Sequence, residues 1–294
     1  MTHTSDEDST ASRLAQASEA LSVLAHELAI AVAETPPETA GAVAGILTSV
    51  SERLSRQALA IAEIVFVVAE ELAGHLLTRY RRACHAGRSF TSADLAALDE
   101  PIQRLLEDNE PLATGAGVAV TPDILADRHL WMQWWVRDGG RATQLLPQLD
   151  PGRPRYYDYT KAVWFAEPAR DLVPHLAPPH FDEGGTDTFM ITATIPTLAG
   201  SRMIGLACAE MTLERLAQLV TPALAALSVP AALITPDSWV AASTHPRLRS
   251  GELVPGGLLG QSRAGEPALF SEPVPGVTVA RSPALAWRLV ADWR

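Results

Sequence analysis

The chain has 294 residues, 47% of them hydrophobic and 19% charged, which is ordinary for a packed globular protein of one large or two small domains. A net charge of −11 with scattered arginines argues against nucleic-acid binding, because phosphate contacts need a clustered basic face. The two cysteines, Cys84 and Cys208, fit no metal or redox spacing, and we expect both to be small core side chains.

The N-terminal part of the chain is expected to be helical. Residues 1–12 are acidic and polar, and they predict a disordered tail that lacks the design of a signal peptide. Over 13–86, apolar residues recur at helical spacing and predict two long helices, separated by Pro36 and Pro37. Both helices have narrow stripes of Ala and Leu, which are typical of packing against a second copy of the chain or, equally, against the chain's own domain.

One apolar run, over 57–77, is long enough to be compared with a membrane span. Glu63, Glu70 and Glu71 interrupt it, and a charged side chain at mid-bilayer costs roughly 2.5–3.5 kcal/mol. Glu63 and Glu70 are seven residues apart and therefore share one face of a helix. The run predicts an amphipathic helix of a soluble, cytoplasmic protein that does not bind membranes.

A larger sheet lobe is predicted over 87–220. It is expected to start with a helix capped by Thr91 or Ser92. Alternating and aromatic-rich segments then predict four strands, over 115–120, 130–136, 189–196 and 203–211. The third strand is expected to end at Pro196 and to form an antiparallel hairpin with the fourth, which turns into a helix near Thr212.

The last residues repeat this pattern on a smaller scale. Residues 230–244 predict a strand, a turn and a strand, and 276–294 predict a final hairpin. We therefore expect a second, smaller sheet lobe over 221–294. The expected fold class is α+β, with long N-terminal helices, an antiparallel sheet domain and this smaller sheet.

Five aromatic residues gather within ten positions, namely Tyr156, Tyr157, Tyr159, Trp164 and Phe165. A core needs apolar bulk but not three hydroxyl groups, so rings beside charged residues are typical of a pocket wall. We expect Tyr157 and Tyr159 to donate hydrogen bonds to a ligand or to stack on it.

The stretch "PPHFDEGGTDTFMITATIP" over 178–196, followed by "AGSRMIG" and "IGLACAEMTLERL", resembles the Cache family of PAS-like sensor domains in bacterial receptors. The resemblance extends from about residue 60 to the end of the chain, and its two lobes suggest the double-Cache arrangement. It implies a ligand-sensing fold, here in a stand-alone soluble form without an output segment. Such a sensor would pass on its state through a homodimer or a separate regulatory partner.

The resemblance also implies residues that bind the ammonium group of an amine or amino acid. The family's Tyr-x-Asp turn reads His180-Phe181-Asp182 here, so Asp182 matches the acid and His180 replaces the tyrosine. The acid of the family's "GxD" strand corresponds to Glu210, which is one methylene longer. His180 would add a donor whose charge depends on pH.

The other end of the ligand is less well matched. The family's Trp-Tyr pair reads Trp164-Phe165, and its arginine position, two residues before Trp164, is Ala162. The nearest cation is Lys161, which we include among the candidate ligand-binding residues. The resemblance therefore supports the amine end of a ligand better than a carboxylate clamp.

The chemistry of the two acids can also be considered by itself. Two carboxylates beside aromatic rings form a site that attracts an ammonium ion. Asp182 could equally cap its own turn by accepting backbone hydrogen bonds, and Glu210 could form an ion pair with a nearby arginine. These alternatives remain open at the level of the sequence.

We expect a small-molecule sensor for a cationic amine or amino acid, without a cofactor, and not an enzyme. Nucleophile and phosphate-binding motifs such as G-x-S-x-G and G-x-G-x-x-G are missing. One rival is a structural or interaction protein whose Cache-like lobe has lost its ligand. A less favoured rival is a metal-dependent enzyme that uses His175, His180 and Asp182.

Overall fold

The computed structural model describes residues 64–254, apart from 111, 139, 226–228 and 236–237, together with strands over 277–281 and 288–292. Within it the chain forms two compact units, one over Ala62–Thr212 and one that contains the described residues from Leu213 onward. The expected tail and the first expected helix lie outside the described residues.

The first unit begins with a helix over 64–85, which Gly87 follows in a left-handed conformation with φ of 65°. Its apolar stripe is fully buried at Val68, Leu72 and Leu76, as expected of a helix that packs through one face. No helix among the described residues is both long and apolar enough to cross a bilayer.

Two shorter helices follow, α3 (Ser92–Ala96) and α4 (Asp99–Asp108). Thr91 is the N-cap of α3, as predicted, and forms a capping box with Asp94. The sequence suggested one helix here, but Pro101 stands in the first turn of α4 and would break a continuous helix.

The six strands of the first unit form one antiparallel sheet in the order β3-β2-β1-β6-β5-β4. Their bounds are β1 (Gly115–Val120), β2 (Met132–Asp138), β3 (Arg141–Leu145), β4 (His175–Phe181), β5 (Phe189–Ala199) and β6 (Arg202–Thr212). The predicted β5–β6 hairpin is confirmed, and Gly200 has a left-handed φ of 67° in its turn. β1 and β6 are central, so most of their residues are buried.

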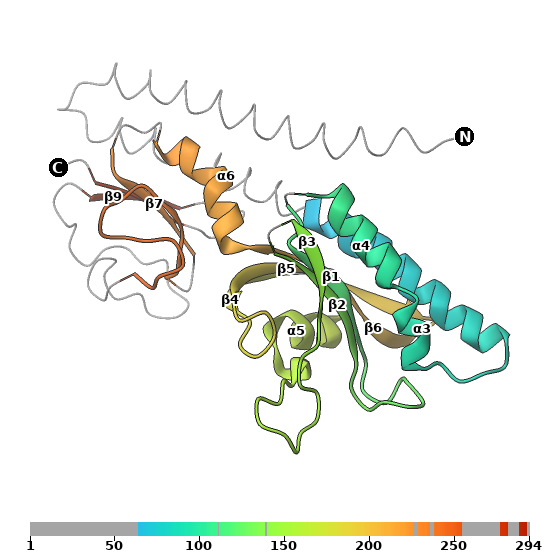
Figure 1. The fold of residues 1–294 in the computed structure, drawn as a ribbon. Coiled ribbons are helices and arrows are strands. Elements are labelled where there is room, and N and C mark those ends of the chain that lie inside the picture. The colour runs from blue at the N-terminus through green and yellow to red at the C-terminus, as the bar shows by residue number, and fades with distance from the viewer. Residues whose placement is uncertain are drawn as a thin grey trace, which may run out of the picture. The chain divides into compact units, whose positions relative to one another are not determined.

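Helices cover the two faces of this sheet (Figure 1). The helix over 64–85 and α4 lie on one face, and α5 (Val163–Asp171) lies on the other, where it packs on β4 and β5. A 3-10 turn, η1 (Tyr159–Lys161), leads directly into α5. The α5 face therefore holds the aromatic segment that the sequence singled out.

The second unit consists of α6 (Leu213–Ala225) and a four-stranded sheet in the order β8-β7-β10-β9. Its strands are β7 (Ala231–Ile234), β8 (Val240–Ser243), β9 (Val277–Arg281) and β10 (Arg288–Asp292). Both predicted hairpins are present. The α+β fold class with a larger and a smaller antiparallel sheet is confirmed.

Two details differ from the expectations. β5 continues through Pro196, because β4 pairs with β5 only as far as Thr194 and a missing N–H is tolerated where the strand becomes an edge. Cys84 is exposed near the end of its helix, whereas Cys208 is buried as expected. The expected lobe bounds of 87–220 and 221–294 stay predictions.

Candidate functional site

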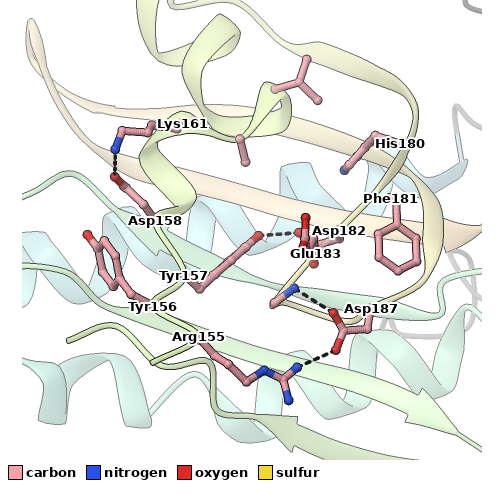
Figure 2. Close-up of a pocket in the computed structure, with 13 residues that line it drawn as sticks. Arg155, Tyr156, Tyr157, Asp158, Lys161, His180, Phe181, Asp182, Glu183 and Asp187 are labelled. Atoms are coloured by element: carbon pink, nitrogen blue, oxygen red, sulfur yellow. Dashed lines mark hydrogen bonds and ion pairs between the residues drawn. The ribbon is translucent and has the colours of Figure 1, made fainter. Parts of the chain in front are cut away.

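A pocket of about 570 Å³ lies on the α5 side of the first unit, between the segment over 155–163 and the turn that follows β4 (Figure 2). Charged and aromatic side chains dominate its lining. The lining residues are Arg155, Tyr156, Tyr157, Asp158, Lys161, Ala162, Val163, His180, Phe181, Asp182, Glu183, Gly184 and Asp187.

Asp182 is the most deeply buried charged residue of this lining, with 8% of its surface exposed. Its Oδ1 accepts a hydrogen bond from the Tyr157 hydroxyl (2.5 Å), and its Oδ2 accepts one from the backbone N–H of Thr186 (2.9 Å). Asp182 therefore caps its own turn and also lines the pocket, so the two interpretations of this residue are compatible.

The two glycines of the turn are required by its geometry. Gly184 has a left-handed φ of 82°, a conformation in which a side chain is strained, and an added Cβ would lie 3.6 Å from the ring of Tyr157. A Cβ on Gly185 would clash with the Asp182 carboxylate. The Gly-Gly pair thus lets the turn fold tightly around the acid that it presents.

Tyr157 lines the pocket from its buried side. It is 7% exposed, and its backbone N–H donates to the Gln148 carbonyl (2.7 Å). Burial raises the pKa of its phenol well above the usual value, and the neighbouring Asp182 carboxylate raises it further. Tyr157 therefore remains a hydrogen-bond donor throughout the physiological pH range.

The two permanent cations of the lining are each bound to their own acid. Arg155 Nη2 lies 2.9 Å from Oδ2 of Asp187, and Lys161 Nζ lies 2.8 Å from Oδ2 of Asp158. The contact with Lys161 holds the pKa of Asp158 below its usual value. Among the described residues, Asp182 in contrast receives only neutral donors, so its negative charge has no cation bound to it.

Glu210 lies behind this pocket, on the α5 face of β6, and does not line it. Its neighbours on that face are Gly115 of β1 and Thr192 of β5, and a Cβ on Gly115 would clash with its carboxylate. The indole Nε1 of Trp134 donates a long hydrogen bond of 3.4 Å to Oε1.

The environment of Glu210 strongly favours its neutral form. Burial raises the pKa of this carboxyl group to about 8, and the negative charge of Asp182 adds to the increase. No arginine or lysine of the described part of the chain forms an ion pair with it. At neutral pH the carboxyl group of Glu210 is therefore predominantly protonated.

The predicted aromatic wall is mainly part of the core. Tyr159, Trp164 and Phe165 are buried in one cluster with Trp134, and their ring centroids lie 5.1–6.3 Å apart. The Tyr159 hydroxyl donates to the Val120 carbonyl (2.7 Å). The roles of these three residues in ligand binding stay predictions, because none of them lines the pocket in the structure.

Of the eight predicted ligand-binding residues, the structure brings Tyr157, Lys161, His180 and Asp182 together around the pocket. His175 is not among the residues that line the pocket, and its Nε2 lies 2.9 Å from Oε2 of Glu167. No group of three or more potential ligands for a metal ion occurs among the described residues.

Sequence reasoning missed several pocket residues, above all Arg155 and Asp187. Arg155 stands directly before the aromatic segment, and this position in the sequence could have indicated that it belongs to the pocket. Asp187 lies in the turn that follows β4, and its Oδ1 accepts a hydrogen bond from the Gly184 N–H (2.8 Å).

Comparison with known proteins agrees with this fold. Residues 100–218 match a family model described as the first PDC sensor domain of methyl-accepting-chemotaxis-protein-like proteins. No curated protein matches the chain in sequence.

Several solved structures share the fold. A methyl-accepting chemotaxis protein X has 18% identity and a TM-score of 0.53, covering 84% of this chain and 98% of its own. The extracellular domain of a protein described as a histidine kinase has 15% identity and a TM-score of 0.52, with 83% and 92% covered. The ligand-binding domain of the Campylobacter jejuni chemoreceptor Tlp3, in complex with 4-methylisoleucine, has 11% identity and a TM-score of 0.51, with 87% and 94% covered.

These matches agree with the expected resemblance, since PDC and Cache domains are related groups of sensor folds. All of the pocket residues fall within the matched range of 100–218. The segment of the chain that forms the pocket is therefore similar in sequence to PDC sensor domains and has the fold of chemoreceptor ligand-binding domains.

Proposed function

We propose that this protein is a sensor that binds a small molecule with a cationic amine, an amino acid included, in the pocket lined by Asp182. The observation that supports this most is a buried carboxylate that faces a pocket and has only neutral hydrogen-bond donors. A buried charge is costly unless it is paired, and an ammonium ion would supply the pairing.

The surroundings of Asp182 suit such a ligand. Tyr156 and Phe181 line the same pocket, and aromatic faces attract ammonium groups by about 0.5–2 kcal/mol. The Tyr157 hydroxyl donates a hydrogen bond to one oxygen of Asp182 and so fixes the orientation of this carboxylate before a ligand binds. The protonated Glu210 behind it can ionise when a cation arrives, which would add a second negative charge.

The comparisons support this proposal at a coarser level. The matched family model describes a sensor domain, and one structure with the same fold is a chemoreceptor domain in complex with 4-methylisoleucine. We propose an amino acid or a simple amine as the ligand of the present chain as well.

Binding of amines and amino acids can be measured by isothermal titration calorimetry after a thermal-shift screen, because a ligand that binds the folded state raises the melting temperature. We expect Asp182→Asn to weaken binding about 10- to 100-fold, the usual worth of a hydrogen bond to a charged group. Glu183→Gln is the matched control, because Glu183 lines the same pocket but is exposed.

Equal effects of the two substitutions would remove Asp182 from the site. Failure of all amines and amino acids to bind would favour a protein whose lobe has lost its ligand. The expected homodimer, regulatory partner and cytoplasmic location stay predictions, which light scattering, pull-down and cell fractionation would check.

A further inference from the structure

We propose that Thr194 positions the α5 wall of the pocket by supplying a hydrogen bond that Pro168 cannot donate. This wall consists of Ala162 and Val163, the N-cap and the first residue of α5, which both line the pocket. The fixing of the wall is a property of the folded chain, and only its consequence for ligand affinity rests on the proposed function.

Pro168 interrupts the hydrogen-bond ladder of α5. It stands inside this helix and is buried. In an α-helix each N–H donates to the carbonyl four residues earlier, so the carbonyl of Trp164 lacks the donor that any other residue type at position 168 would provide. The proline ring also crowds a carbonyl in that position, which favours a carbonyl that points out of the ladder. A buried carbonyl without a donor costs free energy, so a replacement donor stabilises the helix here.

Thr194 supplies the replacement donor from the sheet. Its hydroxyl group donates to the Trp164 carbonyl at 3.2 Å, from a position 30 residues away in the sequence. Thr194 lies in β5, is fully buried, and pairs with Cys208 of β6. The first turn of α5 is therefore bonded to the interior of the sheet at the residue that directly follows the pocket wall.

Other contacts of α5 with the sheet are of a different kind. Trp164 and Phe165 pack in the aromatic cluster, and apolar contacts of this type are not directional. His175 of β4 lies 2.9 Å from Glu167, but the two side chains are 28% and 42% exposed, so this contact contributes little. The bond from Thr194 is both directional and buried, and it therefore fixes where the first turn of α5 lies.

A double-mutant cycle tests whether Thr194 replaces the missing donor. Thr194→Val removes the hydroxyl group and keeps the shape, and we expect hydrogen exchange of the α5 amides to rise about 5- to 10-fold, the worth of one ordinary hydrogen bond. In a Pro168→Ala background, position 168 has an N–H of its own, so Thr194→Val should leave the exchange of these amides within about twofold. Thr194→Ser keeps the hydroxyl group and should retain most of the protection of wild type.

Thr192→Val is the matched control for the exchange measurement. Thr192 lies two residues earlier on the same face of β5 and is also buried, but its hydroxyl group has no hydrogen-bond partner among the described residues. Its substitution should leave the exchange of α5 unchanged. The amides of α4 serve as the internal reference for opening of the whole unit.

The consequence for the pocket is measured by isothermal titration calorimetry with n-butylamine as the probe. Thr194→Val should weaken binding about 3- to 10-fold, because the wall must then be ordered when the amine enters. In the Pro168→Ala background, Thr194→Val should cause no further loss of affinity. Thr194→Ser should bind nearly as tightly as wild type.

An equal rise of exchange in α4 and α5 would mean that Thr194 stabilises the whole unit, and it would overturn the inference. An unchanged α5 in Thr194→Val, or the same rise with and without Pro168, would overturn it as well. Equal affinity of all variants for n-butylamine, despite the expected exchange, would separate Thr194 from the pocket. If wild type does not bind n-butylamine, the exchange cycle still decides whether Thr194 fixes α5, and only the proposed binding of simple amines is lost.

Discussion

Glu210 should make the stability of the folded protein depend on pH. Its pKa is about 8 in the folded protein, against 4.5 for the ordinary side chain. Because the folded state holds a proton that the unfolded state has released, the contribution of Glu210 to stability is greatest below pH 4.5 and falls as the pH rises towards 8. At 1.36 kcal/mol for each pH unit, this contribution falls by about 3 kcal/mol between pH 4.5 and pH 7.

Glu210→Gln removes this loss, because an amide is neutral at every pH and has nearly the shape of the protonated acid. We expect the variant to match wild type near pH 4.5 and to be about 3 kcal/mol more stable at pH 7. The difference should stop growing above pH 8, where both states of wild type have released the proton.

Urea unfolding at several pH values, followed by tryptophan fluorescence, measures this difference. Glu183→Gln is the control, since it removes an exposed acid and should give a curve parallel to wild type. Parallel stability curves for Glu210→Gln and wild type between pH 5 and pH 8 would refute the reasoning. They would mean that the carboxyl group is solvated or paired in the folded protein.

Further predictions follow from the same unit. Gly115→Ala should destabilise it by about 1–3 kcal/mol, because the new Cβ meets Glu210, and Glu210→Ala in the same chain should recover most of the loss in urea unfolding. Tyr159→Phe should cost about 1 kcal/mol through the lost bond to Val120 without changing ligand affinity, whereas Tyr157→Phe should weaken amine binding in calorimetry. Amine affinity of wild type should rise as the pH passes through 8 and Glu210 ionises, and Glu210→Gln should abolish this rise.

Much of the larger sheet could be predicted from sequence because its strands alternate and its turns contain glycine. β5 and β6 have clear period-2 patterns, and Gly200 marks the turn between them. The turn that presents Asp182 could also be predicted, because Gly184 and Gly185 follow the acidic pair Asp182-Glu183. Local chemistry of this kind is contained in a short window of sequence.

Long-range placement could not be predicted in the same way. Arg155 meets Asp187 across 32 residues, and the contact depends on how the loop before η1 crosses the β4–β5 turn. Trp164 and Phe165 have rings that fit a pocket wall or a core equally well, and only the packing of α5 on the sheet decides for the core. The space for Glu210 depends on Gly115, which the register of β1 and β6 places opposite it.

The β4–β5 turn is ordered before a ligand binds. Its carbonyl at Asp182 accepts from the N–H groups of Gly185 and Asp187, and its carboxylate from Thr186, so the turn is ordered by its own bonds. An incoming ligand therefore meets a preorganised anion and spends little conformational entropy on shaping it. Association should then proceed at the rate of ordinary docking, and differences among ligands should appear chiefly in their residence times.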